Sequence, residues 1–279
     1  MGLIEIFKAI LFGIIEGITE WLPISSTGHL ILFDEFVHFN MSDEFKEMFL
    51  VVIQLGAILA VVLLFWNKLF PFSFKQKPII KKEIFSMWFK IVVASIPAAV
   101  VGLLWDDEID ALFYNHITVS IALIVFGILF IIIEDRNKGK APKVRTIADI
   151  TYPLAITIGV FQLIAAVFPG TSRSGATILG ALLIGLSRTV AAEFTFFLAI
   201  PAMAGASLLK IVKFGFDYTN LEIAVLFSGM IVAFLVSVFV IKFLMGYIKK
   251  NDFKVFGWYR IFLGAIVLGY YVINTFIIK

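Results

Sequence analysis

The sequence lacks cysteine and is poor in charge. The absence of cysteine excludes disulfides and thiolate metal sites. Only 15% of its 279 residues are charged, whereas a soluble domain usually has about 25%. No run of basic residues with interleaved aromatic ones is present, although that pattern is typical of nucleic-acid binding. These absences argue against a disulfide-stabilised domain, a soluble globular protein and a nucleic-acid partner.

Apolar side chains are abundant instead. They make up 61% of the chain, with 31 phenylalanines and a mean hydropathy of +1.02, so lipid is the expected solvent. A helix that crosses the roughly 30 Å hydrocarbon core needs about 20 apolar residues. Six stretches meet this requirement: Met48–Trp66, Ile84–Trp105, Ile117–Ile133, Val190–Val212, Leu221–Leu244 and Phe256–Ile278.

Two further apolar regions are interrupted by polar segments. Leu3–Ile18 is followed by WLPISSTGH, and Thr151–Phe168 is followed by PGTSRSG and then by Ala176–Leu186, which is too short to cross. Each region therefore reads as a helix, a break and a half helix. Because irregular backbone at membrane depth must be buried in protein or line a wet cavity, the two breaks are expected to face one another.

The loop charges predict the topology. Asn67–Glu83, Asp135–Ile147 and Gly246–Val255 are rich in lysine and arginine, so the positive-inside rule places them in the cytoplasm. The acidic loops Asp106–His116 and Gly215–Asn220 are then external, as are both termini. Each broken region must return to the face it left. Parity allows two full spans there, but the short second limbs favour re-entrant hairpins.

Matches at a constant offset indicate an internal repeat. With one hairpin and three spans in each half, about 1–133 and 150–279, the second half is inverted. We therefore expect an all-α polytopic membrane protein, a single membrane domain with six spanning helices and two re-entrant hairpins. Such folds place their sites near the midplane, at broken helices. The pairs 146 positions apart are Gly13/Gly159, Glu16/Gln162, Pro23/Pro169, Ser25/Thr171, Ser26/Ser172 and Glu47/Glu193.

The breaks also carry the polar residues that suggest chemistry. Glu16 and Glu20 are four positions apart, so both carboxylates lie on one helix face and call for a cation or a metal between them. Arg173 of the second break offers that cation, and its planar fork suits phosphate oxygens equally well. Half helices beginning after Ser26 and after Ser174 would direct their N-terminal amides at the same point, which favours an anion.

A nucleophile and a base are also at hand. Ser26 and His29 lie within one helical turn, as in hydrolases. The rival interpretation is a carrier of anions or lipid diphosphates, which would equally use Arg173 and helix dipoles. A carrier has no need of a serine and a histidine beside paired carboxylates, so the enzyme interpretation is favoured.

Four segments resemble one known family. EGITEWLPISSTGHL (Glu16–Leu30) and PGTSRSGAT (Pro169–Thr177) resemble the two signature motifs of the undecaprenyl-diphosphate phosphatases, the bacitracin-resistance proteins. VVIQLGAILAVV and AAEFTFFLAIP are similar to further segments of that family. Trp21 and Thr195 stand where the family pattern has Phe and Ser, and neither is expected to contact a catalytic position.

The resemblance implies a bacterial plasma-membrane hydrolase. It would convert undecaprenyl diphosphate to the monophosphate, a recycling step in carrier-lipid supply for peptidoglycan synthesis, with Mg²⁺ or Ca²⁺ as cofactor. Attack by Ser26 and direct attack by water both remain open, and a trapped phosphoserine would separate them. Also open are a monomer or a homodimer, the face from which the headgroup enters, and lipid transport. The roles expected are catalysis by Glu20, Ser26, His29 and Arg173, metal binding by Glu16 and Glu20, and substrate binding by Ser25, Thr27, Ser172, Ser174 and Thr177.

Overall fold

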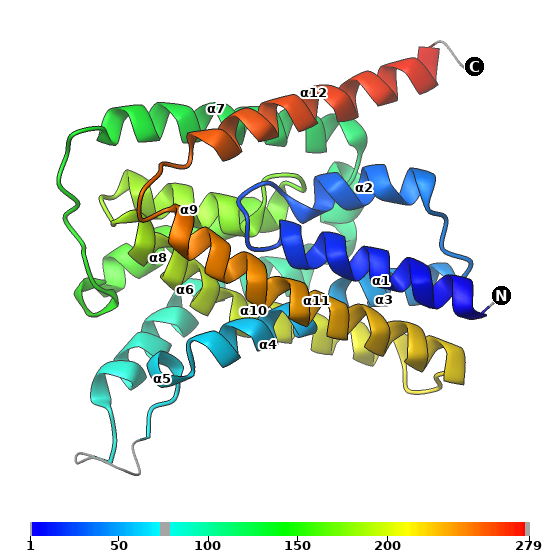
Figure 1. Ribbon diagram of the computed structural model, residues 1–279, viewed down its shortest axis with the longest axis horizontal. Coiled ribbons are helices and arrows are strands. Elements are labelled where there is room, and N and C mark those ends of the chain that lie inside the picture. Colours follow the sequence, from blue (N-terminus) through cyan, green and yellow to red (C-terminus); the bar gives the residue numbers. More distant parts are fainter. Residues whose placement is uncertain (1, 73–78, 277–279) are drawn as a thin grey trace.

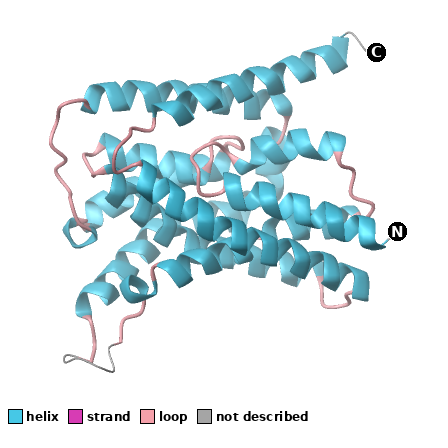
Figure 2. Cartoon of the chain, in the orientation of Figure 1, coloured by secondary structure: helices cyan, strands magenta, loops and turns pink. Residues whose placement is uncertain are grey.

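The computed structural model describes residues 2–72 and 79–276, and within this part the chain folds into helices and loops without a strand (Figure 2). Lys75 and Lys77 of the first basic loop, and the last residues of the sixth predicted span, lie outside it. The helices, labelled in Figure 1, are α1 (Gly2–Thr19), α2 (Ser26–Phe36), α3 (Asp43–Val52), α4 (Gln54–Leu64), α5 (Trp66–Leu69), α6 (Lys82–Phe113), α7 (His116–Asn137), η1 (Ile147–Asp149), α8 (Tyr152–Val167), α9 (Arg173–Leu183), α10 (Arg188–Phe214), α11 (Asn220–Tyr247) and α12 (Lys254–Phe276).

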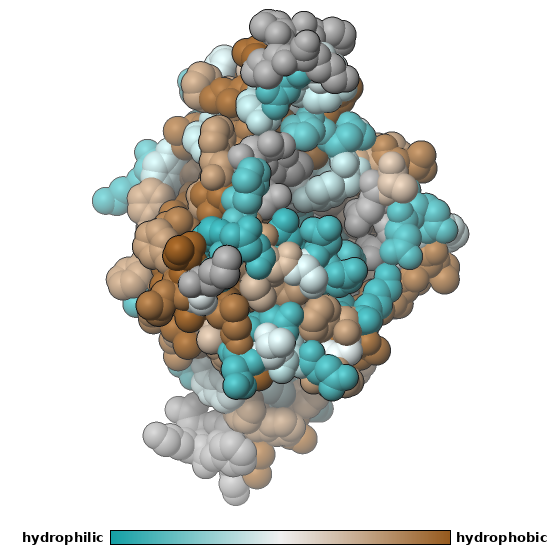
Figure 3. Space-filling view, turned by 90° about the vertical axis from the view of Figure 1, so that its right-hand side faces the viewer, coloured by the Kyte–Doolittle hydropathy of each residue, from teal (hydrophilic) through white to brown (hydrophobic). Residues whose placement is uncertain are grey.

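The six predicted spans are confirmed as helices long and apolar enough to cross a membrane. They correspond to α3 with α4, the first part of α6, then α7, α10, α11 and α12. Large apolar side chains stand exposed along their outer faces, as lipid contact requires. Hydrophilic residues gather instead on the end that carries both termini, with apolar residues flanking them (Figure 3).

One expected external loop is largely helical. The segment Asp106–His116 was predicted to be a loop, but α6 continues through it to Phe113. The helix changes direction at Trp105, whose backbone leaves the helical region with φ −136°. The acidic residues that follow Trp105 mark the end of the apolar stretch, and they do not end the helix.

The two interrupted regions form helix pairs that reach the middle of the molecule from opposite ends (Figure 1). The pair α1–α2 lies toward the end with the termini, and the pair α8–α9 lies toward the other end. Helix α9 has 11 residues, about 16 Å at 1.5 Å per residue, so it is too short to cross alone. That the pairs α1–α2 and α8–α9 enter a bilayer and return to the same face stays a prediction, as does the inverted repeat.

The two halves of the chain interlock. Helix α1 packs along α11, and α8 packs along α6, so each first limb lies on a long helix of the other half. Glycines permit this approach: a Cβ at Gly13 would lie 2.6 Å from the carbonyl oxygen of Gly229, and one at Gly159 would lie 2.3 Å from that of Ala94. Helix backbones can approach this closely only where a side chain is missing.

Ion pairs join the halves at both ends. Glu193 of α10 accepts from Lys68 of α5 at 2.8 Å, and Glu47 of α3 pairs with Lys210 of α10. The described parts of the three basic loops lie at the end opposite the termini (Figure 1), as the parity of the crossings requires. Which end faces the cytoplasm stays a prediction.

We predict that Gly159→Ala lowers the apparent midpoint of thermal unfolding in detergent by several degrees. The added methyl group would meet the backbone of α6 at 2.3 Å, and overpacking of this kind costs about 1–3 kcal/mol. Gly102→Ala is the matched control, because a Cβ at this position would have nothing within 4 Å and alanine favours the helix. Equal midpoints for the two variants would contradict close packing of α6 on α8.

Candidate active site

The two breaks have the same local construction. Ser25 and Ser172 are the N-caps of α2 and α9, with φ of 73° and 67°, and no other residue but glycine has positive φ in residues 2–72 and 79–276. Each serine Oγ accepts from the backbone N–H of a glycine three residues on, Gly28 at 3.3 Å and Gly175 at 3.1 Å. Two non-glycine caps with positive φ are costly, and such strain typically marks functional sites.

The helix starts correct the sequence prediction. The second limbs were expected to begin after Ser26 and after Ser174, yet they begin at Ser26 and at Arg173. The caps are 147 positions apart, and the constant offset of 146 is therefore wrong by one residue at the breaks. The segment from Pro169 to the cap Ser172, which contains Gly170 with φ 88°, is one residue longer than the segment from Pro23 to the cap Ser25. Ser26 and Arg173 thus occupy the same first-turn position of two opposed helices.

A buried ion pair joins the two breaks. Arg173 Nη2 lies 2.8 Å from Glu20 Oε1, and Arg173 Nη1 donates to the carbonyl oxygen of Thr195 at 3.1 Å. Ser26 Oγ donates to the other Glu20 oxygen, Oε2, at 3.2 Å. Glu20 is buried and the side chain of Arg173 is 16% exposed, so the pair is largely, but not completely, shielded from water. The structure therefore brings Glu20, Ser26 and Arg173 together, as the sequence predicted.

Glu16 stands one turn before Glu20 and is fully buried. Neither of its carboxylate oxygens has a hydrogen-bond partner, and its charge interacts with those of Glu20 and Arg173. A buried carboxylate without a donor is unfavourable unless a proton or a cation neutralises it. The Glu16–Glu20 pair therefore has an unfilled requirement for positive charge.

The other predicted hydroxyls have partners within the protein. Ser174 Oγ donates to the carbonyl oxygen of Glu20 at 2.9 Å and lies 3.2 Å from Ser172 Oγ. Thr177 Oγ1 donates to the carbonyl oxygen of Arg173 at 2.9 Å. The hydroxyl group of Thr27 makes no hydrogen bond to any of the described residues. Apart from Thr27, these groups hold the breaks in place before any ligand arrives.

One expectation about a departure from the family pattern was wrong. Thr195 was expected to contact no catalytic position, yet its carbonyl oxygen accepts from Arg173 and its Oγ1 donates to Thr177 Oγ1 at 2.9 Å. Trp21, the other departure, is fully buried and packs edge-on against Phe196 with ring centroids 5.2 Å apart. Both substitutions sit on the helix interfaces that support the site.

His29 is not paired with Ser26. Its Nδ1 lies 2.7 Å from the carbonyl oxygen of Ser25, which can only accept, so Nδ1 carries a proton. Its Nε2 lies 2.6 Å from the hydroxyl of Tyr259, which donates to it when the ring is neutral. Both rings line an apolar groove of about 420 Å³ between α1, α2 and α12. Ser26 and His29 therefore make no hydrogen bond through which the predicted proton transfer could take place. Ser26 is hydrogen-bonded to Glu20 instead.

Sequence reasoning missed the residue that holds the breaks together from behind. Arg260 of α12 is fully buried, and its guanidinium donates to the carbonyl oxygens of Pro23 (3.3 Å), Gly170 (3.0 Å) and Thr171 (2.6 Å). A Cβ at Gly175 would lie 2.6 Å from Arg260 Nη1, so this glycine makes room for it. The available signal was a charge inside an apolar span, which is expensive and usually has a purpose.

Comparisons with known proteins agree with this geometry. The sequence model of the bacitracin resistance protein BacA family matches residues 9–266. The chain belongs to this BacA family. An undecaprenyl-diphosphatase of Desulfitobacterium hafniense is 68% identical over 99% of this chain and 100% of that protein. Undecaprenyl-diphosphatase 1 of Clostridium acetobutylicum is 66% identical over 97% and 98%, and an Enterococcus faecalis undecaprenyl-diphosphatase is 63% identical over 96% and 98%.

Membership of the BacA family covers both breaks and the interlocked helices around them. The matched range runs from the middle of α1 to the middle of α12, so it includes Glu16, Glu20, Arg173 and Arg260. The multi-pass helical fold and the buried polar site are therefore described by one family. This confirms the resemblance drawn from the motifs.

We predict that Arg260→Gln lowers both the apparent unfolding midpoint and the turnover, the latter about tenfold or more. Glutamine cannot reach three carbonyl oxygens, and each buried group left unpaired costs about 1–3 kcal/mol. Unfolding in detergent and the rate of phosphate release are the two measurements. Lys254→Gln on the same helix is the control, since its ion pair with Asp135 is exposed and such pairs contribute at most about 1 kcal/mol. Wild-type behaviour of Arg260→Gln would contradict the bracing role.

Proposed function

We propose that this protein removes the terminal phosphate of undecaprenyl diphosphate, to leave undecaprenyl phosphate, at the site where the two breaks meet. The observation that carries the proposal is the contact of Arg173 with Glu20, which are 2.8 Å apart and belong to helix pairs that reach the middle of the molecule from opposite ends. Ser26 Oγ and the Arg173 guanidinium are each within hydrogen-bond distance of the Glu20 carboxylate, one at each oxygen. The family's relatives named undecaprenyl-diphosphatase support the choice of lipid.

The electrostatics of the site suit a phosphoryl group. The amide ends of α2 and α9 converge on the breaks, and helix N-termini attract anions. Arg173 Nε is buried and has no partner, so one guanidinium donor stays available to a phosphoryl oxygen. Phosphoryl transfer depends chiefly on positioning and charge stabilisation. The site supplies both without large rearrangement.

For the chemical step we propose that Ser26 Oγ attacks the terminal phosphorus. Its proton passes to Glu20 Oε2, which accepts from it at 3.2 Å. The bond between that phosphorus and the bridging oxygen breaks, and undecaprenyl phosphate leaves. Water then attacks the phosphoserine, the phosphorus–Oγ bond breaks, and Glu20 returns its proton to Ser26 Oγ; the second oxygen–hydrogen bond of the water stays on, or ionises from, the inorganic phosphate that is released. This assignment moves the role of base from His29 to Glu20 because of the observed contact.

We assign His29 and Tyr259 to the lipid side of the site. The groove they line is otherwise walled by Ile15, Ile24, Phe33 and other apolar side chains, and it is open beside Ile18 and Phe36. A polyprenyl chain can lie in such a groove while its diphosphate reaches the breaks one helical turn away. The hydrogen-bonded pair would then stand beside the bridging and proximal phosphate oxygens.

The carboxylate pair suits a divalent cation. Glu16 and Glu20 would hold Mg²⁺ or Ca²⁺, which when bound neutralises charge on the diphosphate. The described residues contain no cluster of three or more histidine, aspartate and glutamate side chains that could form a complete protein site. Two carboxylates nevertheless suffice for Mg²⁺, which usually keeps several waters and substrate oxygens in its shell. The unpaired oxygens of Glu16 are the observation that supports this fit.

The orientation follows from charge. We infer that the end bearing the basic loops faces the cytoplasm and that both termini are external, by the positive-inside rule. The helix pair α8–α9 then enters from the cytoplasmic side, and α1–α2 from the external side. In this arrangement each half of the chain contributes one re-entrant hairpin to a common site.

We predict that Arg173→Lys loses most of the turnover, about a hundredfold, although the charge is kept. Lysine cannot bind Glu20, the Thr195 carbonyl and a phosphoryl oxygen at once, because it lacks the planar fork of arginine. The measurement is phosphate released from a polyprenyl diphosphate by purified protein in detergent. Arg136→Lys, at an exposed position of α7, is the control. Near-normal turnover of Arg173→Lys would contradict the proposed role of the guanidinium. If the wild-type protein released no phosphate under any metal condition, transport would be favoured over hydrolysis.

We predict that chelation of divalent cations abolishes phosphate release and that added Mg²⁺ or Ca²⁺ restores it. In Glu16→Gln the cation concentration for half-maximal rate should rise about tenfold or more, because one of two carboxylate ligands is lost. Glu222→Gln removes the carboxylate of an exposed capping box and serves as the control. Turnover that is indifferent to chelator would show that a proton, and not a metal, neutralises the Glu16–Glu20 pair.

A further inference from the structure

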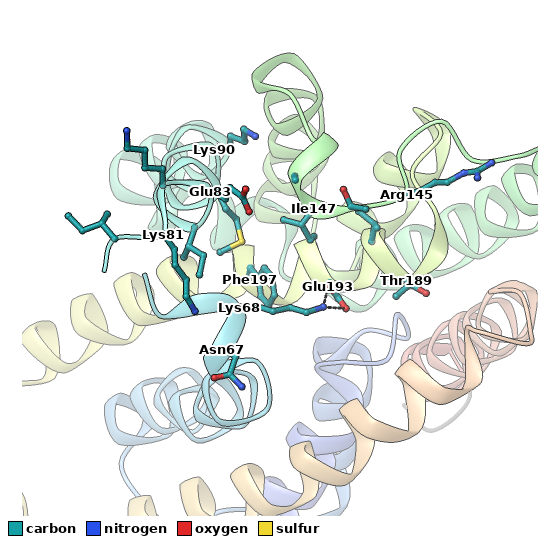
Figure 4. A pocket seen from close by; sticks show the side chains of 17 residues that line it. Asn67, Lys68, Lys81, Glu83, Lys90, Arg145, Ile147, Thr189, Glu193 and Phe197 are labelled. Carbon is teal, nitrogen blue, oxygen red and sulfur yellow. Dashed lines mark hydrogen bonds and ion pairs between the residues drawn. The ribbon is translucent and has the colours of Figure 1, made fainter. Parts of the chain in front are cut away.

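A second polar cavity lies away from the breaks. It has a volume of about 870 Å³ and is bounded by α5, the start of α6, the segment around η1 and the start of α10 (Figure 4). Glu193 and Phe197 of α10 line it, whereas Thr195 of the same helix holds Arg173 with its carbonyl oxygen. None of the residues assigned to the hydrolytic site lines it. The cavity is therefore separated from Arg173 by α10.

Its walls carry an excess of positive charge. Five basic and two acidic side chains line the cavity, and one pair is already satisfied, since Lys68 Nζ lies 2.8 Å from both oxygens of Glu193 (Figure 4). Among the described residues, Lys81, Lys82 and Lys90 make no ion pair. Unpaired cations that line one concave surface raise the local concentration of anions. The cavity is thus suited to a ligand with negative charge.

Lys90 is the most informative of these cations. It is half-buried and stands eight positions into α6, within the candidate span Lys82–Trp105. A charge within a span is expensive, typically faces a wet cavity and pairs with an opposite charge. Lys90 faces this cavity without an acidic partner, and the hydrolytic mechanism does not use it. Its position requires an explanation that topology alone does not provide, because it lies beyond the loop.

The rest of the wall is apolar. Ile84, Met87 and Phe197 line the cavity beside the basic groups. Trp66 is half exposed nearby on α5, and Trp88 donates its indole N–H to the carbonyl oxygen of Leu69 at 2.9 Å. Tryptophans concentrate at the level of lipid headgroups. The ligand that fits has an anionic head and an apolar body, and it lies at the membrane interface.

We propose that this cavity binds the phosphate headgroup of an anionic phospholipid from the leaflet at the basic end of the protein. Basic pockets between helices on the cytoplasmic side are the usual sites for such headgroups. Lys81, Lys82 and Lys90 contact the phosphate, and the first methylene groups of the acyl chains lie against Ile84 and Met87. Inorganic phosphate shares the headgroup's charge but cannot use the apolar wall, which distinguishes the two sources.

The test is native mass spectrometry of the full chain in detergent, titrated with dioctanoyl phosphatidylglycerol. Lys81→Gln/Lys82→Gln/Lys90→Gln is the cavity variant, and Lys138→Gln/Lys249→Gln/Lys250→Gln removes the same charge from exposed positions at the same end. We expect the cavity variant to weaken lipid binding about tenfold or more, because three positive charges that attract the headgroup are lost. The control variant should bind as wild type does. Phosphate release should stay within about twofold of wild type in both, which verifies folding.

Three outcomes would overturn the proposal. The first is equal weakening by both variants, because general attraction to the basic end would then explain binding. The second is equal retention of dioctanoyl phosphatidylcholine, which has no net charge, since the lysines would not be selecting an anion. The third is displacement of the lipid by an equal concentration of inorganic phosphate, which would identify a free anion as the ligand.

Discussion

The ion pair between Arg173 and Glu20 is the interaction on which the rest of the structure depends. It joins two backbone breaks in the middle of the molecule, where an unpaired guanidinium or carboxylate shielded from water would be far more costly than one in water. A buried pair of this kind adds little net stability, because desolvation offsets the attraction. Its importance lies in geometry, since Glu20 also accepts from Ser26, so that a serine, a carboxylate and a guanidinium meet where we propose the chemical step.

The surrounding helices supply hydrogen-bond partners for the polar groups at the two breaks. Serine caps with positive φ, the hydroxyl of Ser174 and the fully buried Arg260 together bind the polar groups that the interruptions expose. The two halves of the chain interlock around the breaks. Helix α1 packs closely on α11, and α8 packs closely on α6. The site and the packing are thus one construction, and a change in either is expected to appear in both stability and turnover.

Positive charge serves two separate purposes in this protein. At the breaks, the half-buried Arg173 and the fully buried Arg260 face carbonyl oxygens and the Glu20 carboxylate, and the helix N-termini add to their field. In the cavity behind α10, Lys81, Lys82 and Lys90 have no acidic partner among the described residues, whereas Lys68 pairs with Glu193. The first arrangement suits a phosphoryl group undergoing transfer, and the second suits a headgroup that only has to stay bound.

How much could be predicted from the sequence depends on the range of the interaction. The six spans, the two breaks and the meeting of Glu20, Ser26 and Arg173 followed from hydropathy, loop charge and local motifs, because a membrane permits few solutions for an apolar chain. The register at the breaks was wrong by one residue, since a single inserted turn residue at Gly170 leaves the surrounding pattern unchanged.

The remaining features depended on contacts between distant segments. Whether His29 faces Ser26 or Tyr259 is decided by the rotation of α2 against α12, 230 positions away along the chain. Thr195 and Arg260 reach the breaks only because α10 and α12 pack there. The sequence alone determined which segments can span a membrane and which polar residues cannot face lipid. The tertiary structure decided which of them touch, because partner choice depends on helix packing and not on local composition.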